Sequence, residues 1–284
     1  MQALTLELLN GLSLLSTLAI VAVGLGIVFG LMGVINLAHG EFVMIGAYVA
    51  FVVAENDLSH WLAIPIAALA VGLLGGVIEI TLIRQVYRRP ELTILATFGL
   101  SIILRQLAEL IFSKDFRSVK NPVPGATEAF GVLFPTYRYV VIGFALSIVV
   151  ATLLAFTRSR LGLIVRAIVA DRDLAESVGV RTRTGNVAAF AIGAATAGVA
   201  GALVAPLGAV EPNLGLSYLP GAFLVVIVGG FTRLSGVLVG AATVAALQTG
   251  VIHFFDAVWA QIASLVLAVV VLQFRNSSIA GATT

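Results

Sequence analysis

The sequence of 284 residues contains no cysteine, few charged residues and only two lysines. Without cysteine the chain forms no disulfide, holds no thiolate-bound metal and offers no thiol nucleophile. Charged residues make up 11% of the chain, whereas a soluble domain has about a quarter. Because so few charges cannot cover a surface that faces water, the composition excludes a soluble globular protein.

Apolar residues take the place of the missing charges. The chain is 60% hydrophobic and its mean hydropathy is +1.10. A membrane-spanning helix needs roughly 20 apolar residues, so this length allows several spans and no separate soluble domain. The 29 glycines and few aromatic residues favour closely packed helices over a β-barrel. We therefore predict an all-α polytopic integral membrane protein, with residues 1–284 forming a single transmembrane domain.

Nine apolar runs can be distinguished along the chain. The second and the seventh are short for a bilayer, so each is expected to be a tilted, broken or re-entrant helix. This gives eight or nine crossings. The runs cover residues 11–33, 40–54, 61–83, 92–112, 137–157, 185–206, 220–231, 235–252 and 258–275.

The basic residues are divided unevenly between the loops. Eleven of the 16 fall on one side of the membrane if the runs alternate in direction. The positive-inside rule places that side in the cytoplasm. The net charge of +2 arises from these loops and does not indicate nucleic-acid binding. The eleven residues are Arg84, Arg88, Arg89, Arg158, Arg160, Arg166, Arg172, Arg181, Arg183, Arg233 and Arg275.

Two loops are long enough to meet a partner. The outer loop, residues 113–136, contains a turn-rich stretch at 121–125 that a soluble protein could contact. The inner loop, residues 158–184, has apolar residues at spacings of three or four from Leu163 to Val178, which predicts a short amphipathic helix closed by Gly179.

The inner-loop helix has two interpretations. It lies on lipid headgroups, or it docks on a cytoplasmic protein. A purely lipid-binding face would be mostly basic, whereas this segment mixes both signs, which favours docking. The charged residues of the segment are Arg166, Asp171, Arg172, Asp173 and Glu176.

Polar residues interrupt the apolar sequence between the first two runs. Asn36 and His39 are three residues apart and would share a helical face. Gly40 permits a bend, and Glu41 would start the next helix, favoured by the helix dipole. A broken helix at membrane depth needs protein or water around it, as in many translocation pathways. The alternative is a capped turn at the membrane interface.

The fourth run carries a polar stripe. Thr97, Ser101 and Arg105 are spaced by four, with Glu109 one turn further on. An arginine near the middle of a span costs about 2.5–3.5 kcal/mol, so it should face protein or water. The stripe either lines a pathway or holds an internal Arg105–Glu109 pair. Glu79, near the end of the third run, is expected to pair with Arg84.

Signatures of enzymes are missing. The two lysines, Lys114 and Lys120, do not lie in a Gly-Lys-Ser/Thr sequence, so the chain has no P-loop for ATP. A Gly-x-Ser-x-Gly nucleophile elbow is also missing. An intramembrane hydrolase would need a nucleophile and a base, and no such set is evident. If transport is active, another subunit supplies the energy.

Several motifs together resemble one family. Gly33-Val-Ile-Asn-Leu-Ala-His-Gly-Glu41 is the most specific, and Thr97-Phe-Gly-Leu-Ser101, Glu211-Pro-Asn-Leu-Gly215 and the run ending at Gly229-Gly230 follow in order. The chain resembles the permease subunits of ABC importers for branched-chain amino acids, and of their urea and amide relatives. The residues do not separate these two substrate branches.

The resemblance implies a multi-pass protein of the bacterial inner membrane with several partners. These are a second, homologous permease subunit, two cytoplasmic ABC ATPases, which bind ATP and magnesium, an extracytoplasmic substrate-binding protein and the membrane lipid. The chain itself would hold no cofactor or metal and would not be an enzyme. A self-sufficient channel or ion-coupled carrier is the alternative from a different class.

The resemblance also assigns roles to two sets of residues. The inner loop would be the coupling segment that meets an ATPase, through Arg166, Asp171, Arg172, Asp173, Glu176 and Gly179. The translocation pathway would lie near Asn36, His39, Glu41, Thr97, Ser101 and Arg105.

Overall fold

The computed structural model describes residues 2–87, 89–129, 131–230 and 234–280. Arg88 and Arg233, two of the basic residues that set the expected orientation, lie outside these ranges. The described chain is mainly α-helical, which confirms the predicted fold class. The helices are α1 (Gln2–Met32), α2 (His39–Glu55), α3 (His60–Ile78), the π-helical turn η1 (Glu79–Ile83), α4 (Arg84–Val86), α5 (Pro90–Phe112), α6 (Thr136–Arg158), α7 (Arg160–Ala170), α8 (Arg172–Ser177), α9 (Thr182–Val204), the 3₁₀ turn η2 (Ala205–Leu207), α10 (Leu214–Gly229), α11 (Leu234–Phe254) and α12 (Ala257–Ala280).

Each predicted apolar run forms a helix, and the two short runs form short helices. Helix α2 has 17 residues and α10 has 16, fewer than the roughly 20 that cross a bilayer. Helix α10 starts at Leu214, earlier than expected, so that Pro220 lies inside the helix and not at its start. Within the described residues, seven helical stretches are long and apolar enough to span a membrane: Leu4–Gly30, His60–Val86, Glu91–Phe112, Thr136–Arg158, Thr182–Leu207, Gly236–Phe254 and Ala257–Phe274.

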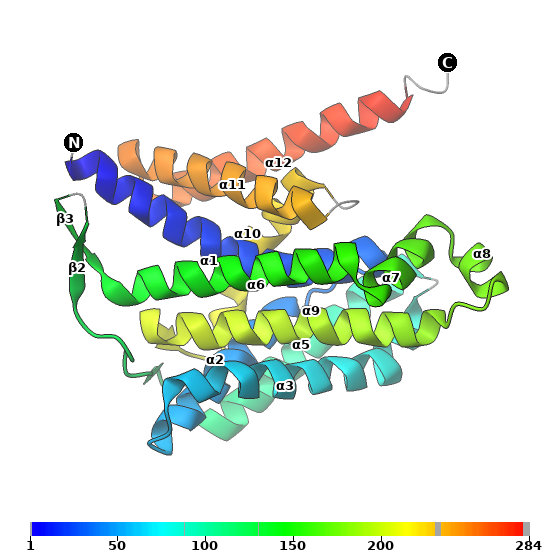
Figure 1. The fold of residues 1–284 in the computed structure, drawn as a ribbon, viewed down its shortest axis with the longest axis horizontal. Helices are drawn as coiled ribbons and strands as arrows, with labels where there is room; N and C mark the ends of the chain where they lie inside the picture. Colours follow the sequence, from blue (N-terminus) through cyan, green and yellow to red (C-terminus); the bar gives the residue numbers. More distant parts are fainter. Residues whose placement is uncertain (1, 88, 130, 231–233, 281–284) are drawn as a thin grey trace.

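The long helices form a bundle with two distinct ends. Figure 1 shows α3, α6 and α9 running side by side along the longest axis of the molecule. The hairpin of β2 (Ala126–Ala129) and β3 (Val132–Pro135) closes one end, next to the N-terminus, and α7 and α8 project from the other. We call these the hairpin end and the α7–α8 end.

Short strands connect two loops at the hairpin end. Strand β1 (Arg117–Ser118) pairs antiparallel with β4 (Ala209–Val210), and Arg117 lies opposite Val210. This pairing joins the loop that follows α5 to the segment that precedes α10, although more than eighty residues separate them in the sequence. The turn-rich outer loop is therefore part of a small folded surface.

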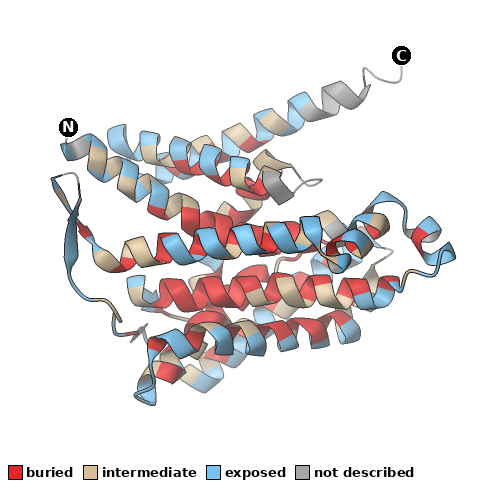
Figure 2. Ribbon diagram, in the orientation of Figure 1, coloured by how far each residue is buried: buried red, intermediate tan, exposed pale blue. Residues whose placement is uncertain are grey.

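Helix α9 lies at the centre of the bundle, and most of its length is buried (Figure 2). Its small residues allow α2 to approach closely, in agreement with the small-residue packing expected of membrane helices. A Cβ atom at Gly201 would overlap the carbonyl oxygen of Val43 in α2, and a Cβ at Gly46 would overlap that of Gly198. Helix α5 is peripheral: only 17% of its most apolar stretch is buried, against 72% for the corresponding stretch of α9.

The close packing of α2 on α9 leads to a prediction. We expect Gly201→Ala to lower the thermal unfolding midpoint of the detergent-solubilised protein, because its methyl group would overlap a backbone oxygen. Overpacking costs about 1–3 kcal/mol, and more where backbone must move. Gly143→Ala in α6 is the matched control, since its Cβ would meet no atom within 4 Å. Equal midpoints for the two variants would contradict the packing described here.

Candidate functional site

The chain between α1 and α2 leaves the helical conformation inside the bundle. Helix α1 ends at Met32, Gly33 has a φ of +62°, and α2 begins at His39. The expected bend at Gly40 is therefore wrong, and the break covers residues 33–38. Asn36 lies in the break, so it does not share a helical face with His39.

Two side chains stabilise this break. The Oδ1 atom of Asn36 accepts the backbone N–H of Ala38 at 3.0 Å, a local bond that competes with helix formation. The Thr97 hydroxyl of α5 accepts the N–H of Leu37 at 3.2 Å. Its proton is shared between carbonyls of its own helix, such as that of Thr93 at 2.9 Å, and the Ile35 carbonyl at 3.2 Å. The irregular backbone thus has hydrogen-bond partners, as it must at membrane depth.

The N-termini of the two short helices meet beside the break. A Cβ at Gly40, near the start of α2, would overlap the carbonyl oxygen of Gly215, near the start of α10. A Cβ at Gly215 would lie 2.6 Å from the Gly40 carbonyl and 2.8 Å from Oε2 of Glu41. Gly40 therefore serves close packing rather than bending. Both helix N-termini lie next to the Glu41 carboxylate, and helix N-termini favour negative charge.

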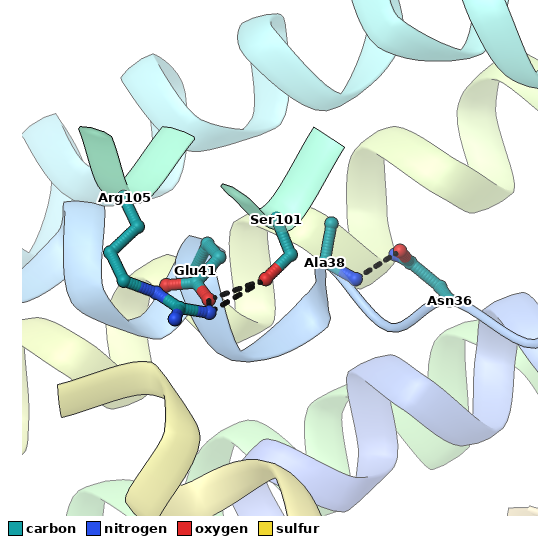
Figure 3. Close-up of polar contacts among 5 residues, drawn as sticks. All are labelled: Asn36, Ala38, Glu41, Ser101 and Arg105. Atoms are coloured by element: carbon teal, nitrogen blue, oxygen red, sulfur yellow. Dashed lines mark hydrogen bonds and ion pairs between the residues drawn. The ribbon is translucent and has the colours of Figure 1, made fainter. Parts of the chain in front are cut away.

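Glu41 is the centre of a buried polar cluster (Figure 3). Its Oε1 accepts the Ser101 hydroxyl at 2.7 Å and the Arg105 guanidinium at 3.1 Å. Arg105 also donates to the Ser101 hydroxyl at 3.2 Å. The Glu41 side chain is 1% exposed and that of Arg105 is 20% exposed. A buried carboxylate is stable here because it has both a cation and a hydroxyl donor.

Arg105 does not form the ion pair with Glu109 that the spacing on α5 suggested. Arg105 binds Glu41 of α2, whereas Glu109 pairs with Lys114 at 3.4 Å, near the end of α5. A pair four residues apart on one helix contributes a few tenths of a kcal/mol, whereas a buried carboxylate without a cation costs several. The expected pair of Glu79 and Arg84 is confirmed, at 3.0 Å.

The predicted site residues fall into three places. Thr97, Ser101 and Arg105 share one face of α5, as their spacing predicted, and this face contacts the start of α2. Glu41 joins Ser101 and Arg105, while Asn36 and Thr97 lie at the break. His39 is fully buried, and its Nε2 lies 3.0 Å from the Val21 carbonyl of α1, away from the Glu41 cluster.

Two residues that take part in the buried contacts around Glu41 and Glu79 were not predicted from the sequence. Gly215 was noted only within a family motif, and its contact with Gly40 leaves no trace in local sequence. Tyr87 donates a hydrogen bond to Glu79, beside Arg84. The eight-residue separation of Tyr87 and Glu79 is about two helical turns, which was the available signal.

The inner loop forms two helices where one was expected. Helix α7 ends at Ala170, and the Asp171 carboxylate accepts the N–H of Leu174 at 2.9 Å, which caps α8. Gly179 has a φ of +85° and closes α8 as predicted. Its N–H bonds the Glu176 carbonyl and the next N–H bonds the Ala175 carbonyl, the pattern of a Schellman motif.

The apolar row that suggested an amphipathic helix is exposed. Leu163, Leu174 and Val178 are 63%, 62% and 72% exposed. The buried apolar residues of α7 and α8 are instead Val165, Ile168 and Ala175. The segment thus exposes three large apolar side chains at the end of the molecule from which α7 and α8 project (Figure 1).

Polar contacts fix this segment to the long helices. Arg166 donates to the carbonyls of Phe156 and Thr157 at the end of α6. Glu176 accepts the Thr182 hydroxyl at 2.6 Å, which joins α8 to the start of α9. The side chains of Arg172 and Asp173, also assigned to coupling, lie outside the described part of the structure.

The architecture defines a class of protein. Short helices that begin inside a bundle, with irregular backbone and buried charges at their start, are typical of membrane transport proteins. The molecule is thus a helical, multi-pass transport protein.

Comparisons with known proteins identify the family. The family model described as "Branched-chain amino acid transport system / permease component" matches residues 7–274. LivH of Escherichia coli K12, named a high-affinity branched-chain amino acid transport system permease protein, is 27% identical over 97% of this chain and 94% of its own. BraD of Pseudomonas aeruginosa is 27% identical over 97% and 95%. A probable LivH of Methanocaldococcus jannaschii is 23% identical over 93% and 88%. No solved structure matches the chain.

The family match extends over nearly the whole chain. The protein therefore belongs to the permease components of branched-chain amino acid transport systems. It is a multi-pass permease subunit of an ABC importer of the bacterial inner membrane. The resemblance drawn from the motifs is confirmed.

The buried ion pair yields a prediction for stability. We expect Arg105→Leu to destabilise the folded protein by about 3–5 kcal/mol, because Glu41 would remain buried without a cation. The measurement is the yield and unfolding midpoint of the detergent-solubilised variant. Lys114→Leu removes the exposed partner of Glu109 and should change stability by less than about 1 kcal/mol. Similar losses in both variants would contradict a special role for the buried pair.

Proposed function

We propose that this permease subunit carries branched-chain or other hydrophobic amino acids into the cytoplasm, with energy from ATP hydrolysed on partner subunits. The observation that carries the proposal is the family match over residues 7–274. The names of LivH and BraD give the substrate class of those relatives, and we extend it to this chain. In this proposal the chain has no ATPase site of its own and binds no cofactor.

The proposal places the α7–α8 end in the cytoplasm. Arginines gather at this end, as the positive-inside rule requires of a cytoplasmic side. Those whose side chains the structure describes are Arg84, Arg89, Arg158, Arg160, Arg166, Arg181 and Arg183. Residues 158–184 are then the cytoplasmic coupling loop of a single transmembrane domain.

We place the translocation pathway along α5 and the start of α2. The exposed face of α5 supports this position, because Gln106 is exposed and Arg105 is partly exposed within the spanning stretch. Polar side chains at this depth face protein or water rather than lipid. By contrast, the exposed residues of α3 between Trp61 and Val77 are all apolar, which suits lipid. The pathway residues proposed are Asn36, His39, Glu41, Thr97, Ser101 and Arg105.

A second, homologous permease subunit would cover the face of α5. The two chains would enclose the pathway between them, which removes Arg105 and Gln106 from lipid. At the opposite ends of this pathway we place the soluble partners. The extracytoplasmic binding protein would dock at the hairpin end, where β1 and β4 join two loops. Two ABC ATPases would dock at the α7–α8 end.

Three exposed apolar side chains on α7, on α8 and just after α8 support the docking of an ATPase at this segment. Leu163, Leu174 and Val178 would be covered by the ATPase, while Arg166, Asp171, Glu176 and Gly179 hold the segment in shape. Arg172 and Asp173 would add charged contacts. Force from the ATPase would pass to α9 through the contact between Glu176 and Thr182.

The docking surface can be tested by introducing one charged residue. We expect Leu174→Glu to reduce the amount of co-purified ATPase at least about tenfold, since a buried carboxylate at an interface costs more than 1.4 kcal/mol. The chain should remain in the membrane at normal yield. Leu133→Glu makes the same change at a similarly exposed leucine of the hairpin end, and should leave ATPase association intact. Undiminished ATPase binding by the Leu174 variant would remove this surface from the coupling interface.

The assembly and substrate can be tested together. We expect the tagged chain, purified from its native membrane in mild detergent, to bring down a second permease and P-loop ATPases. Reconstituted with its binding protein, this complex should take up leucine only when ATP is present. Uptake of urea in place of leucine would assign the chain to the urea and amide branch. Uptake by the isolated chain without ATP would instead indicate a channel or ion-coupled carrier.

A further inference from the structure

The Glu41–Arg105 pair retains unused hydrogen-bonding capacity. Oε2 of Glu41 and Nε of Arg105 are buried and have no hydrogen-bond partner among the described residues. Polar atoms buried in proteins are normally paired. Arg105 is 20% exposed, whereas Glu41 is 1% exposed. A ligand would therefore approach the pair across the exposed face of α5, from the side of the arginine.

The surroundings of the pair carry an excess of positive charge. The N-termini of α2 and α10 both end beside Glu41, where Gly40 and Gly215 touch. Each N-terminus acts as roughly half a positive charge, and Arg105 adds a full one. The Glu41 carboxylate offsets only part of this sum. The cluster is therefore suited to a second carboxylate, provided that Glu41 also receives a cation.

We propose that Glu41 and Arg105 bind the charged head of a zwitterionic amino acid. Its ammonium group pairs with Oε2 of Glu41, and its carboxylate pairs with Arg105. This inference rests on the proposed function and names the part of the substrate that the site binds. On binding, one internal ion pair is replaced by two ion pairs with the substrate. No buried charge is left alone, and the net charge of the site does not change.

This exchange of partners selects for zwitterions. A substrate with only one of the two charges would leave either Glu41 or Arg105 unpaired inside the membrane, which is strongly unfavourable. Urea carries neither charge and would leave the internal pair closed.

The proposal is tested by removing both charges, Glu41→Gln together with Arg105→Gln. Two glutamines keep hydrogen-bonding groups and avoid the lone charge that either single substitution leaves. We expect the complete complex to assemble and to hydrolyse ATP, with ATP-driven leucine uptake reduced at least about tenfold. Uptake equal to that of the unchanged complex would overturn the proposal and leave the pair a purely structural role.

A second buried pair supplies the control. Glu79 and Arg84 form an ion pair at 3.0 Å that lies outside the proposed pathway. Glu79→Gln with Arg84→Gln should leave leucine uptake per assembled complex nearly unchanged. An equal loss in this control would show that removal of any buried pair stops transport, and it would overturn the specific role of Glu41 and Arg105.

A measurement on the unchanged complex is independent of how well any variant folds. The complex is loaded with photo-leucine, which carries a diazirine in its side chain, held with a non-hydrolysed ATP analogue and irradiated. We expect cross-links within residues 39–48 of α2 and 101–112 of α5. Cross-links confined to other segments would overturn the proposal.

Failure of the proposed function would look different from failure of this inference. If the function is wrong, the unchanged complex takes up no leucine with ATP. If only this inference is wrong, leucine uptake persists and does not depend on the two charges.

Discussion

A carboxylate inside a membrane bundle needs a cation, and the contact between Glu41 and Arg105 meets that need across two helices. Several other features depend on it. It attaches the peripheral helix α5 to the start of α2, together with the contact of Thr97 at the break. It also places a negative charge at the meeting point of two helix N-termini, where the dipoles stabilise it. Without this pair, the buried Glu41 carboxylate would lie next to the break between α1 and α2 without a cation.

Close backbone contacts hold α2 and α10 in place around this cluster. Gly198 and Gly201 of α9 allow α2 to approach backbone to backbone, and Gly40 and Gly215 do the same for α2 and α10. These contacts cannot loosen gradually, because close-packed interiors do not deform continuously. Helix α5 also forms an ion pair and hydrogen bonds with the start of α2, and the partners of these contacts can be exchanged. These exchangeable contacts add to the apolar contacts of α5, among them the stacking of Phe112 on Tyr48 of α2.

At the α7–α8 end, polar residues and apolar residues have different positions. Asp171 and Gly179 determine where α8 begins and ends, and Glu176 joins it to α9. The apolar residues Leu174 and Val178 contribute nothing to this internal framework and remain exposed. The capped helix α8 is thus joined to the central helix by its polar residues, while its apolar side chains stay uncovered.

The sequence by itself determined the membrane class, the helical runs, the two short helices and the polar face of α5, because hydropathy and periodicity are local properties. Its motifs also determined the family. Local spacing could not decide the partner of Arg105, since Glu109 on the same helix was equally available, and burial of Glu41 settled it. The position of the break and the contact between Gly40 and Gly215 likewise depended on the tertiary structure, because both arise where segments distant in sequence meet.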